Sequence, residues 1–523
     1  MNRITIYAIL TALLIGAGWM QPNAQAANWY VDPNATGSNT GASWANAWTA
    51  FSSITWGSGG VQAGDTLYIS GGSSSQTYTS PLTIGASGTS GSQITIATGA
   101  LSPSPYGYSG TVIFDAGNTQ ANSPMLSSTQ SYVTINGNDG DGNINWQFQN
   151  AYRPVGGGNS TDNNIMSLSS GGSYTGNKVL YVAFHDVASA LYAASNCSFE
   201  VAHCSFYNIL GNQAISTIGS CSATLGNILI HHNSIQINCD PNQGYYGPDG
   251  IESTYGTDAY NNTFTAITTS NLGIQHPDFI QWDFHYDRAW NNTFFTATGA
   301  YTNSVMFPNF TASPAAITNF TFVNNVLNNI QYEGLAFSDG GGPTTISNLT
   351  IANNTFVDCI GGGNYPMRVS FGASSSVSNA IIENNIFYDS GSKNGNIQVI
   401  LVDATTEQQA GITFDYNNVN AGTNGNTELM WDNNGSWTAI SQAHGQTGAP
   451  SFVSYTPHFQ TNNYQLSSSD TACRGEGVNL NSISLLTRDI AGSGRPSTGA
   501  WDIGAFELNA STIQPPHNLR LSN

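Results

Sequence analysis

A polar residue pair recurs seven times between His232 and Asn418, and the copies introduce short apolar runs. The first pair is His-Asn and the other six are Asn-Asn. The pairs follow one another at intervals of about 30 residues. The pairs are His232-Asn233, Asn261-Asn262, Asn291-Asn292, Asn324-Asn325, Asn353-Asn354, Asn384-Asn385 and Asn417-Asn418. A repeat of this length, built from strands and turns without helical periodicity, predicts a parallel β-helix. Asparagines at equivalent positions would then stack about 4.8 Å apart and hydrogen-bond as a ladder.

The composition fits an all-β solenoid that does not bind nucleic acid. The chain has 57 glycines and only 8% charged residues, so turn-forming residues are abundant. Its net charge is −20 with ten lysines and arginines. A basic stripe supplies most of the affinity of nucleic-acid-binding proteins, and this chain lacks the residues for one. A polyanionic partner would be repelled unless a cation intervened.

The first 26 residues have the pattern of a secretory signal. Arg3 provides the positive start, residues 4–19 the apolar stretch, and Ala24-Gln25-Ala26 a cleavage site of small residues. The mature chain is therefore expected to begin at Ala27. No later run reaches the ~20 apolar residues of a membrane span. We expect a secreted or periplasmic bacterial protein, and a monomer.

The six cysteines allow two interpretations. Four of them, Cys197, Cys204, Cys221 and Cys239, fall within two turns of the predicted coil, while Cys359 and Cys473 lie apart. An exported chain permits disulfides, and cysteines stacked as free thiols inside a solenoid are the alternative. Because no Cys-x-x-Cys occurs, zinc-ribbon and haem-attachment sites are excluded.

Both ends of the chain carry motifs that resemble a known superfamily. The segments at residues 29–33 and 64–69, Trp-Tyr-Val-Asp-Pro and Gly-Asp-Thr-Leu-Tyr-Ile, resemble the amino-terminal cap of bacterial right-handed parallel β-helix proteins of the pectate-lyase-like superfamily. Residues 489–492 and 502–507 resemble the closing motif of many such exported proteins. The resemblance implies a right-handed β-helix with caps at both ends. It leaves the activity open, because the superfamily contains lyases, hydrolases, epimerases and non-catalytic surface proteins.

The organisation expected along the chain follows from these motifs and from the extent of the repeats. It comprises a signal peptide at 1–26, an amino-terminal cap with the first strands at 27–90, the β-helix at 91–420, loops and a carboxy-terminal cap at 421–508, and a tail at 509–523.

The densest cluster of charge lies between Asp249 and Arg288. Alignment of two successive turns on their Asn-Asn-Thr-Phe motifs places Asp249 one rung above Asp278 and Glu252 above Gln281. Carboxylates about 4.8 Å apart repel each other, so this arrangement requires a shared proton, a bound cation or a basic neighbour.

The residues around this pair predict a sugar-binding groove on one face of the coil. Aromatic rings beside carboxylates suit pyranose stacking, with polar groups that fix the hydroxyls. The predicted substrate-binding residues are Tyr245, Tyr246, Gln281, Trp282, His285, Tyr286 and Glu333. The predicted catalytic residues are Asp249, Glu252, Asp278, His276, Arg288 and Arg368.

The resemblance further implies Ca²⁺ bound by aspartates from adjacent rungs, here Asp249 and Asp278 with Asp283. Members that are lyases remove the proton α to a uronate carboxylate with Lys or Arg. No lysine occurs between Lys178 and Lys393, so the base here would be Arg368, Arg288 or a histidine. The leading hypothesis is a Ca²⁺-assisted lyase acting on a uronate-containing polysaccharide.

Two other interpretations stay open. A glycoside hydrolase could use the same carboxylates as acid and base, since either catalytic spacing is within their reach. A non-catalytic glycan-binding or surface protein would need Asp249 and Asp278 only as turn residues. In that case Arg368 is a plain ion-pair partner of Glu333. The His231-His232 pair is interpreted as a polar corner of the ladder.

Overall fold

The structure is a computed structural model, and its description covers most of the chain. The described residues are 26–117, 124–151, 164–168, 173–193, 197–211, 213–217, 227–238, 248–253, 256–267, 277–282, 287–297, 303–307, 316–331, 333–339, 344–359, 365–389, 398–420, 427–433 and 436–508. The predicted signal segment up to residue 25 and the predicted tail lie outside them.

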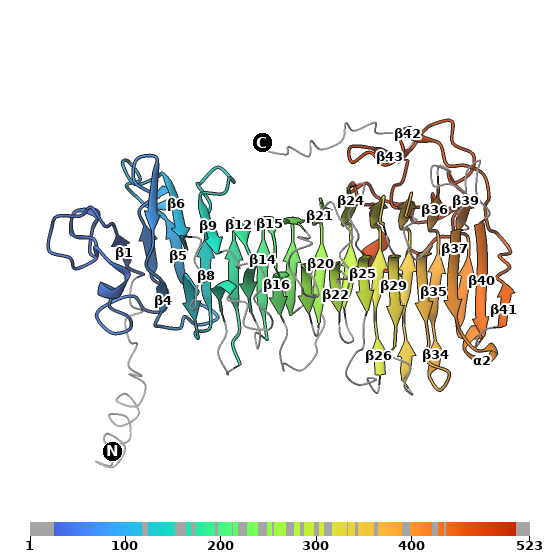
Figure 1. Ribbon diagram of the computed structural model, residues 1–523, viewed down its shortest axis with the longest axis horizontal. Helices are drawn as coiled ribbons and strands as arrows, with labels where there is room; N and C mark the ends of the chain where they lie inside the picture. The colour runs from blue at the N-terminus through green and yellow to red at the C-terminus, as the bar shows by residue number, and fades with distance from the viewer. Residues whose placement is uncertain are drawn as a thin grey trace, which may run out of the picture.

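The chain winds around a common axis, and the strands of its successive coils form three long sheets that run along this axis (Figure 1). This parallel β-helix confirms the predicted fold. Sheet 1 contains β1 (Asn28–Val31), β2 (Thr66–Ile69), β5 (Ile94–Thr98), β8 (Val133–Asn136), β11 (Asn177–Leu180), β14 (Phe199–Ala202), β17 (Ile228–His231), β20 (Thr257–Tyr260), β23 (Arg288–Trp290), β27 (Thr321–Val323), β31 (Thr350–Ala352), β35 (Ala380–Glu383) and β38 (Ile412–Asp415).

Sheet 2 contains β3 (Ser75–Tyr78), β6 (Thr111–Asp115), β9 (Trp146–Ala151), β12 (Ala183–Val187), β15 (Ser205–Ile209), β18 (Ser234–Ile237), β21 (Thr263–Ala266), β24 (Thr293–Thr296), β28 (Val326–Asn328), β32 (Thr355–Val357), β36 (Ile386–Tyr388) and β39 (Asn418–Asn420). Sheet 3 contains β4 (Leu82–Ile84), β7 (Leu126–Ser128), β10 (Asn164–Ser167), β13 (Ser189–Tyr192), β16 (Gln213–Thr217), β19 (Asp249–Ser253), β22 (Asp278–Trp282), β25 (Asn303–Phe307), β29 (Glu333–Ser338), β33 (Tyr365–Ser370), β37 (Gln398–Asp403), β40 (Thr427–Asn433) and β41 (Ser436–Ala439). From β2 to β40, each coil visits sheets 1, 2 and 3 in that order.

The remaining elements are short. They are a small sheet of β26 (Ala316–Thr318), β30 (Thr345–Ser347) and β34 (Ser376–Ser378), the antiparallel pair β42 (Phe452–Ser454) and β43 (Asn463–Leu466), the 3-10 helices η1 (Trp44–Asn46), η2 (Phe51–Ser53), η3 (Gly99–Leu101) and η4 (Ser484–Leu486), and α2 (Thr406–Gln409). None of the helices in the described part of the chain is long and apolar enough to cross a membrane.

The two members of each Asn pair have different tasks at the corner between sheets 1 and 2. The first member adopts a left-handed backbone conformation, with φ of 54° at Asn261 and 56° at Asn291. Asparagine tolerates this conformation better than most residues, and it allows the chain to turn sharply into sheet 2. The second member points inward and forms the ladder.

The ladder runs through the buried second asparagines, as predicted. Asn262 Nδ2 donates to Asn292 Oδ1 over 3.1 Å, and Asn325 Nδ2 donates to Asn354 Oδ1 over the same distance. Each ladder amide also forms hydrogen bonds with backbone groups of adjacent coils, as Asn262 does, so the buried amides of the ladder are satisfied. The last pair, Asn417-Asn418, is shifted by one residue from the predicted pattern. Tyr416 adopts the left-handed corner conformation with φ of 56°, Asn417 joins the ladder, and Asn418 begins β39.

Aromatic and branched side chains fill the coil interior. Phe114, Phe148, Phe184 and Phe206 stack from successive strands of sheet 2, with adjacent ring centroids 4.8 to 5.4 Å apart. All four are fully buried. Such pairs contribute about 0.5–1.5 kcal/mol each beyond their buried area. The core therefore repeats with the coil and fixes the register of the sheets.

The cysteines show both predicted behaviours. Cys204, Cys359 and Cys473 are buried thiols. Cys197 is disulfide-bonded. Cys221 and Cys239 lie outside the described residues.

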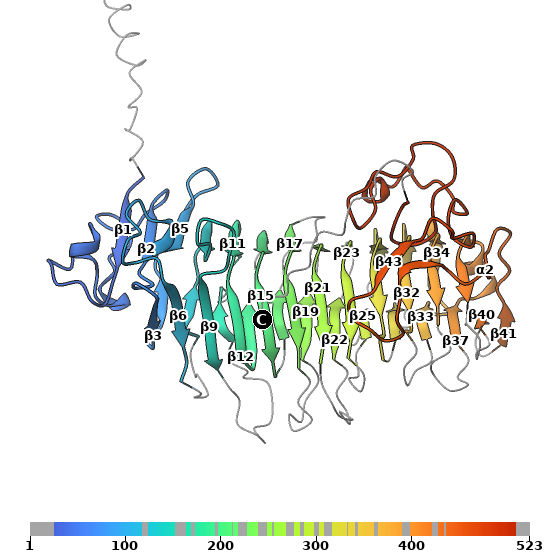
Figure 2. The same cartoon turned by 90° about the horizontal axis from the view of Figure 1, so that it is seen from above.

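The carboxy-terminal segment lies along the flank of the later coils (Figures 1 and 2). Leu480, Leu486 and Trp501 pack on Val323 and Ala352 of sheet 1. Corner asparagines bind its backbone: Asn353 Nδ2 donates to the carbonyl oxygens of residues 502 and 504, and Asn384 Nδ2 donates to that of residue 478. The segment expected as a cap thus also covers the side of the coil.

Candidate functional site

The connections around the coil distinguish sheet 3 from the other sheets. β20 ends at Tyr260 and β21 begins at Thr263, which leaves only a tight corner between sheets 1 and 2. By contrast, β21 ends at Ala266 and β22 begins at Asp278. Binding and catalytic groups concentrate on long connections that a rigid scaffold positions, so sheet 3 is the expected location of a functional site.

Acidic residues form a column where the strands of sheet 3 begin. β19 and β22 pair with Ile251 opposite Ile280 and Glu252 opposite Gln281, which places Asp249 beside Asp278 as predicted. The backbone N–H of Asp278 donates to Asp249 Oδ1 over 2.8 Å.

The same position continues through β25 to β29. Asp278 pairs with Asn303, and β25 pairs with β29 in a register that puts Glu333 in the next coil. Asp249, Asp278 and Glu333 are called the acidic column below.

The residues that follow the acidic column pack against the core of the coil. A Cβ atom added to Gly250 would meet the ring of Phe264 at 3.2 Å, and one added to Gly334 would meet the ring of Phe356 at 3.1 Å. The next residues along the strands, Ile251, Ile280 and Leu335, are also fully buried core residues, so strand alternation does not assign the acidic column to one face of sheet 3.

The column is covered, however. Asp249 and Glu333 are each 7% exposed, and Asp278 is 0% exposed. The expectation of an open groove is corrected at these three residues, because their carboxylates do not face bulk solvent.

Arg368 is the cation beside this column. Its Nη1 atom lies 3.7 Å from Glu333 Oε1, and its side chain is 46% exposed. Its guanidinium carbon lies 5.8 Å from the centre of the Tyr365 ring. Burial raises the pKa of Glu333, Arg368 opposes that shift, and the charge of Asp278 adds to it. The ion pair of Arg368 with Glu333, which the non-catalytic interpretation expects, is present.

Sequence reasoning missed two further acids on sheet 3. Asp403 and Asp432 occupy paired positions on β37 and β40. Burial raises the pKa of Asp403, the neighbouring Asp432 raises it further, and Arg368 lowers it. The Asn-pair repeat ends near residue 420, so the sequence provides no register for pairing Asp432 with Asp403.

Two predicted site residues lie elsewhere. Trp282 is fully buried, and its ring packs edge-on against Phe320 at 5.4 Å, so it belongs to the core and cannot stack on a sugar. Arg288 lies in β23 of sheet 1, where its Nε atom donates to Asp258 over 2.6 Å and its guanidinium covers Trp290. It does not contact the acidic column.

The remaining predicted residues divide into two groups. Glu252 and Gln281 are partly exposed and lie opposite each other on sheet 3. Tyr245, Tyr246, His276, Asp283, His285 and Tyr286 lie outside the described residues.

Comparisons with known proteins identify the fold. No family model and no curated protein sequence matches the chain. Among solved structures, the complex of XylC with xylose is similar at a TM-score of 0.51 and 9% identity, covering 92% of this chain and 98% of that one. Pectate lyase Pel9A matches at 0.40 and 15% identity over 92% and 96% of the two chains, and a rhamnogalacturonan lyase at 0.42 and 13% over 85% and 97%. The likeness to XylC, together with the sheet topology, shows that this protein has the parallel β-helix fold.

Proposed function

We propose that the protein is a secreted lyase that cleaves a uronate-containing polysaccharide on the outer side of sheet 3 with the assistance of Ca²⁺. The observation that carries this proposal is the position of Arg368. It is a nearly half-exposed guanidinium directly beside a buried column of carboxylates. An acidic substrate meets a cation there on a chain whose net charge is −20.

The acidic column fits Ca²⁺ by the chemistry of its donors. Asp249 and Asp278 offer carboxylate oxygens from adjacent coils, and Ca²⁺ prefers such oxygen ligands. Burying like charges one rung apart is unfavourable unless a cation or a proton offsets them. When bound, the ion would offset this repulsion and add positive charge beside the substrate carboxylate. Asp283, the third predicted ligand, remains a prediction from the sequence.

Arg368 is suited to holding the substrate. A guanidinium binds a carboxylate through two parallel N–H donors, and Glu333 and Tyr365 fix its position. Neutralising the uronate carboxylate makes the adjacent C–H proton easier to remove. Because a guanidinium stays protonated in proteins, Arg368 would bind the carboxylate rather than act as the base. Of the bases expected from the sequence, Arg368, Arg288 or a histidine, this proposal uses a histidine, and His276, two residues before Asp278, is the candidate.

A glycoside hydrolase is the second candidate, and the pKa of Glu333 favours it. Burial and Asp278 raise that pKa, as a general acid requires. Asp278 lies two coils away, roughly 9 to 10 Å along the axis, near the upper end of the spacing in inverting glycosidases. Glu333 would then protonate the leaving oxygen while Asp278 activates water.

A product assay separates these activities. The mature chain from Ala27 is incubated with a panel of uronate and neutral polysaccharides, and both ultraviolet absorbance of unsaturated ends and new reducing ends are measured. Unsaturated ends on a uronate polymer support the lyase. Reducing ends without unsaturation select the hydrolase. Neither product on any polymer contradicts an enzymatic role and leaves glycan binding.

A further inference from the structure

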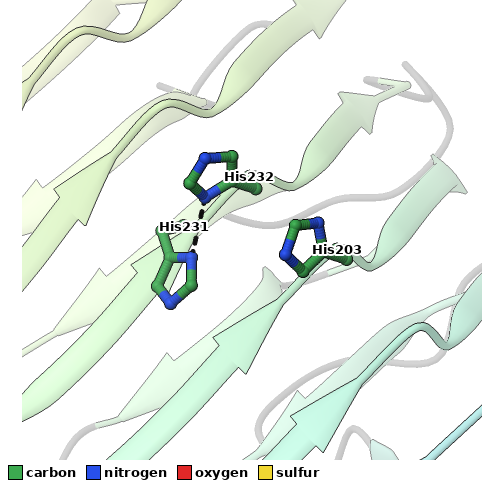
Figure 3. A group of neighbouring side chains, drawn as sticks. All are labelled: His203, His231 and His232. Carbon is green, nitrogen blue, oxygen red and sulfur yellow. Dashed lines mark hydrogen bonds between the residues drawn. The ribbon is translucent and has the colours of Figure 1, made fainter. Parts of the chain in front are cut away.

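Three histidines gather at the corner between sheets 1 and 2, away from the acidic column. His203 and His232 occupy the left-handed corner position in consecutive coils, with φ of 57° and 56°. His231 is the last residue of β17. One third of the nine histidines in the chain thus meet at one point (Figure 3).

The ring nitrogens of this cluster are close enough to share an ion. One nitrogen from each ring lies within 4.8 Å of the others. His231 Nδ1 and His232 Nδ1 are 2.9 Å apart, and the His203 and His232 rings stack with centroids 5.0 Å apart. Metal–imidazole bonds are about 2.0–2.1 Å long, so donors around one ion lie roughly 3 to 3.5 Å from each other. Small rotations of the exposed His203 and His232 rings would bring all three into that range.

A carboxylate fixes the orientation of the central histidine. His231 Nε2 lies 3.3 Å from Glu200 Oε1, and the other oxygen of Glu200 lies 2.6 Å from Lys178 Nζ. With Nε2–H donating to Glu200, the Nδ1 lone pair of His231 faces His232. A carboxylate on the far nitrogen of a histidine is the usual support for a metal ligand.

The fold does not require histidine at these positions. The next two coils make the same corner with Asn261 and Asn291, both at positive φ. The positions equivalent to His231 carry Tyr260 and Trp290. A purely structural chain of hydrogen bonds is the alternative, in which Asn261 Nδ2 donates to His232 Nε2 over 3.2 Å. That chain accounts for His231 and His232 but leaves His203 only a stacking role.

We propose that His203, His231 and His232 form a binding site for a divalent transition metal that prefers imidazole, such as Zn²⁺, Cu²⁺ or Ni²⁺. Three protein ligands leave a coordination position for water or for an external ligand. The site differs from the acidic column in both location and donor chemistry, so either can exist without the other.

Calorimetric titration of the untagged mature protein with ZnCl₂ tests the site. We expect one equivalent to bind, and at least tenfold weaker binding in His203→Asn and in His232→Asn. Asparagine suits both positions because Asn261 and Asn291 already hold the same backbone conformation. The double variant should not bind. His444→Asn, which changes an exposed histidine paired with Asp415, is the matched control and should bind as the native protein does.

Paramagnetic resonance of the Cu²⁺-loaded protein provides a second readout. Nitrogen couplings from three imidazoles should fall to two in His232→Asn, while circular dichroism shows an unchanged fold. Absence of a one-equivalent site, or zinc binding that is equal in the native protein and the double variant, would overturn the proposal.

Discussion

The backbone N–H of Asp278 donates to Asp249 Oδ1 over 2.8 Å, so one carboxylate of the acidic column holds the strand that carries the next. Asp249 therefore has a structural task in addition to its proposed role as a ligand. A substitution that removes its oxygen would damage both. Asparagine keeps an acceptor oxygen and removes only the charge.

Asp249→Asn and Asp278→Asn should each weaken Ca²⁺ binding by at least about tenfold, because each removes one anionic ligand. Cleavage activity should fall in parallel, whereas the thermal midpoint without Ca²⁺ should not fall. Calorimetry and the product assay measure the two effects. Asp141→Asn, at an exposed position, is the control. Unchanged Ca²⁺ affinity in both column variants would remove the metal site from the account.

Arg368→Ala should lower kcat/KM on a uronate polymer by about 100-fold or more, as expected for loss of a charge that stabilises the transition state. Arg368→Lys should restore only part of the activity, because an ammonium cannot make the paired contact of a guanidinium. Steady-state kinetics provide the measurement. Arg474→Ala changes an exposed arginine and should behave as the native enzyme. If Arg368→Ala keeps native kinetics, the proposed substrate contact is wrong.

The two asparagines of one pair should differ in their effect on stability. Asn292→Ala removes the acceptor of the Asn262 backbone N–H and the side-chain donor to Asn325 Oδ1 and to the Ala259 carbonyl oxygen. We expect a loss on the order of 3 kcal/mol in the free energy of unfolding. Asn291→Gly preserves the positive φ and should cost less than about 1 kcal/mol. Urea unfolding of both variants makes the comparison, and equal losses would contradict the separate roles.

Glu383 should make stability depend on pH. Burial, together with Asp415 in the next coil, raises the pKa of Glu383 to about 7. The folded protein thus holds this proton more tightly than the unfolded chain, and stability from this group falls as pH rises from about 4.5 to about 7. Glu383→Gln should gain about 2 to 3 kcal/mol near pH 8 and little near pH 4.

Urea unfolding at both pH values tests the effect of Glu383. Glu407→Gln, on the exposed side of α2, should give no such difference. A gain at pH 8 that does not exceed the gain at pH 4 would refute the assigned cause.

The fold was readable from the sequence because one interaction repeats in each coil between Asn233 and Asn417. Asn262, Asn292 and Asn354 keep the same spacing to an apolar run, so their positions define the register. The pair Asn417-Asn418 misled the prediction by one residue. The corner there is made by Tyr416, and a tyrosine gives no signal for a positive φ.

The site was only partly readable, because neighbours in sequence turn onto different faces. Arg288 follows Asp278 closely, yet it lies on sheet 1 across a corner of the coil. Trp282 is on the same strand as Asp278, and its ring is buried in the core against Phe320. Arg368 and Glu333 belong to paired strands with a regular register, which brings them into the ion pair that the non-catalytic interpretation expects.

Removal of Ca²⁺ tests the central claim most directly. The native protein is assayed for unsaturated products on an active uronate polymer, then in excess chelator, and then after Ca²⁺ is restored. We predict that chelation abolishes product formation while circular dichroism stays unchanged, and that Ca²⁺ restores it. Full activity in excess chelator would contradict the Ca²⁺-assisted lyase and favour acid–base hydrolysis by Glu333 and Asp278.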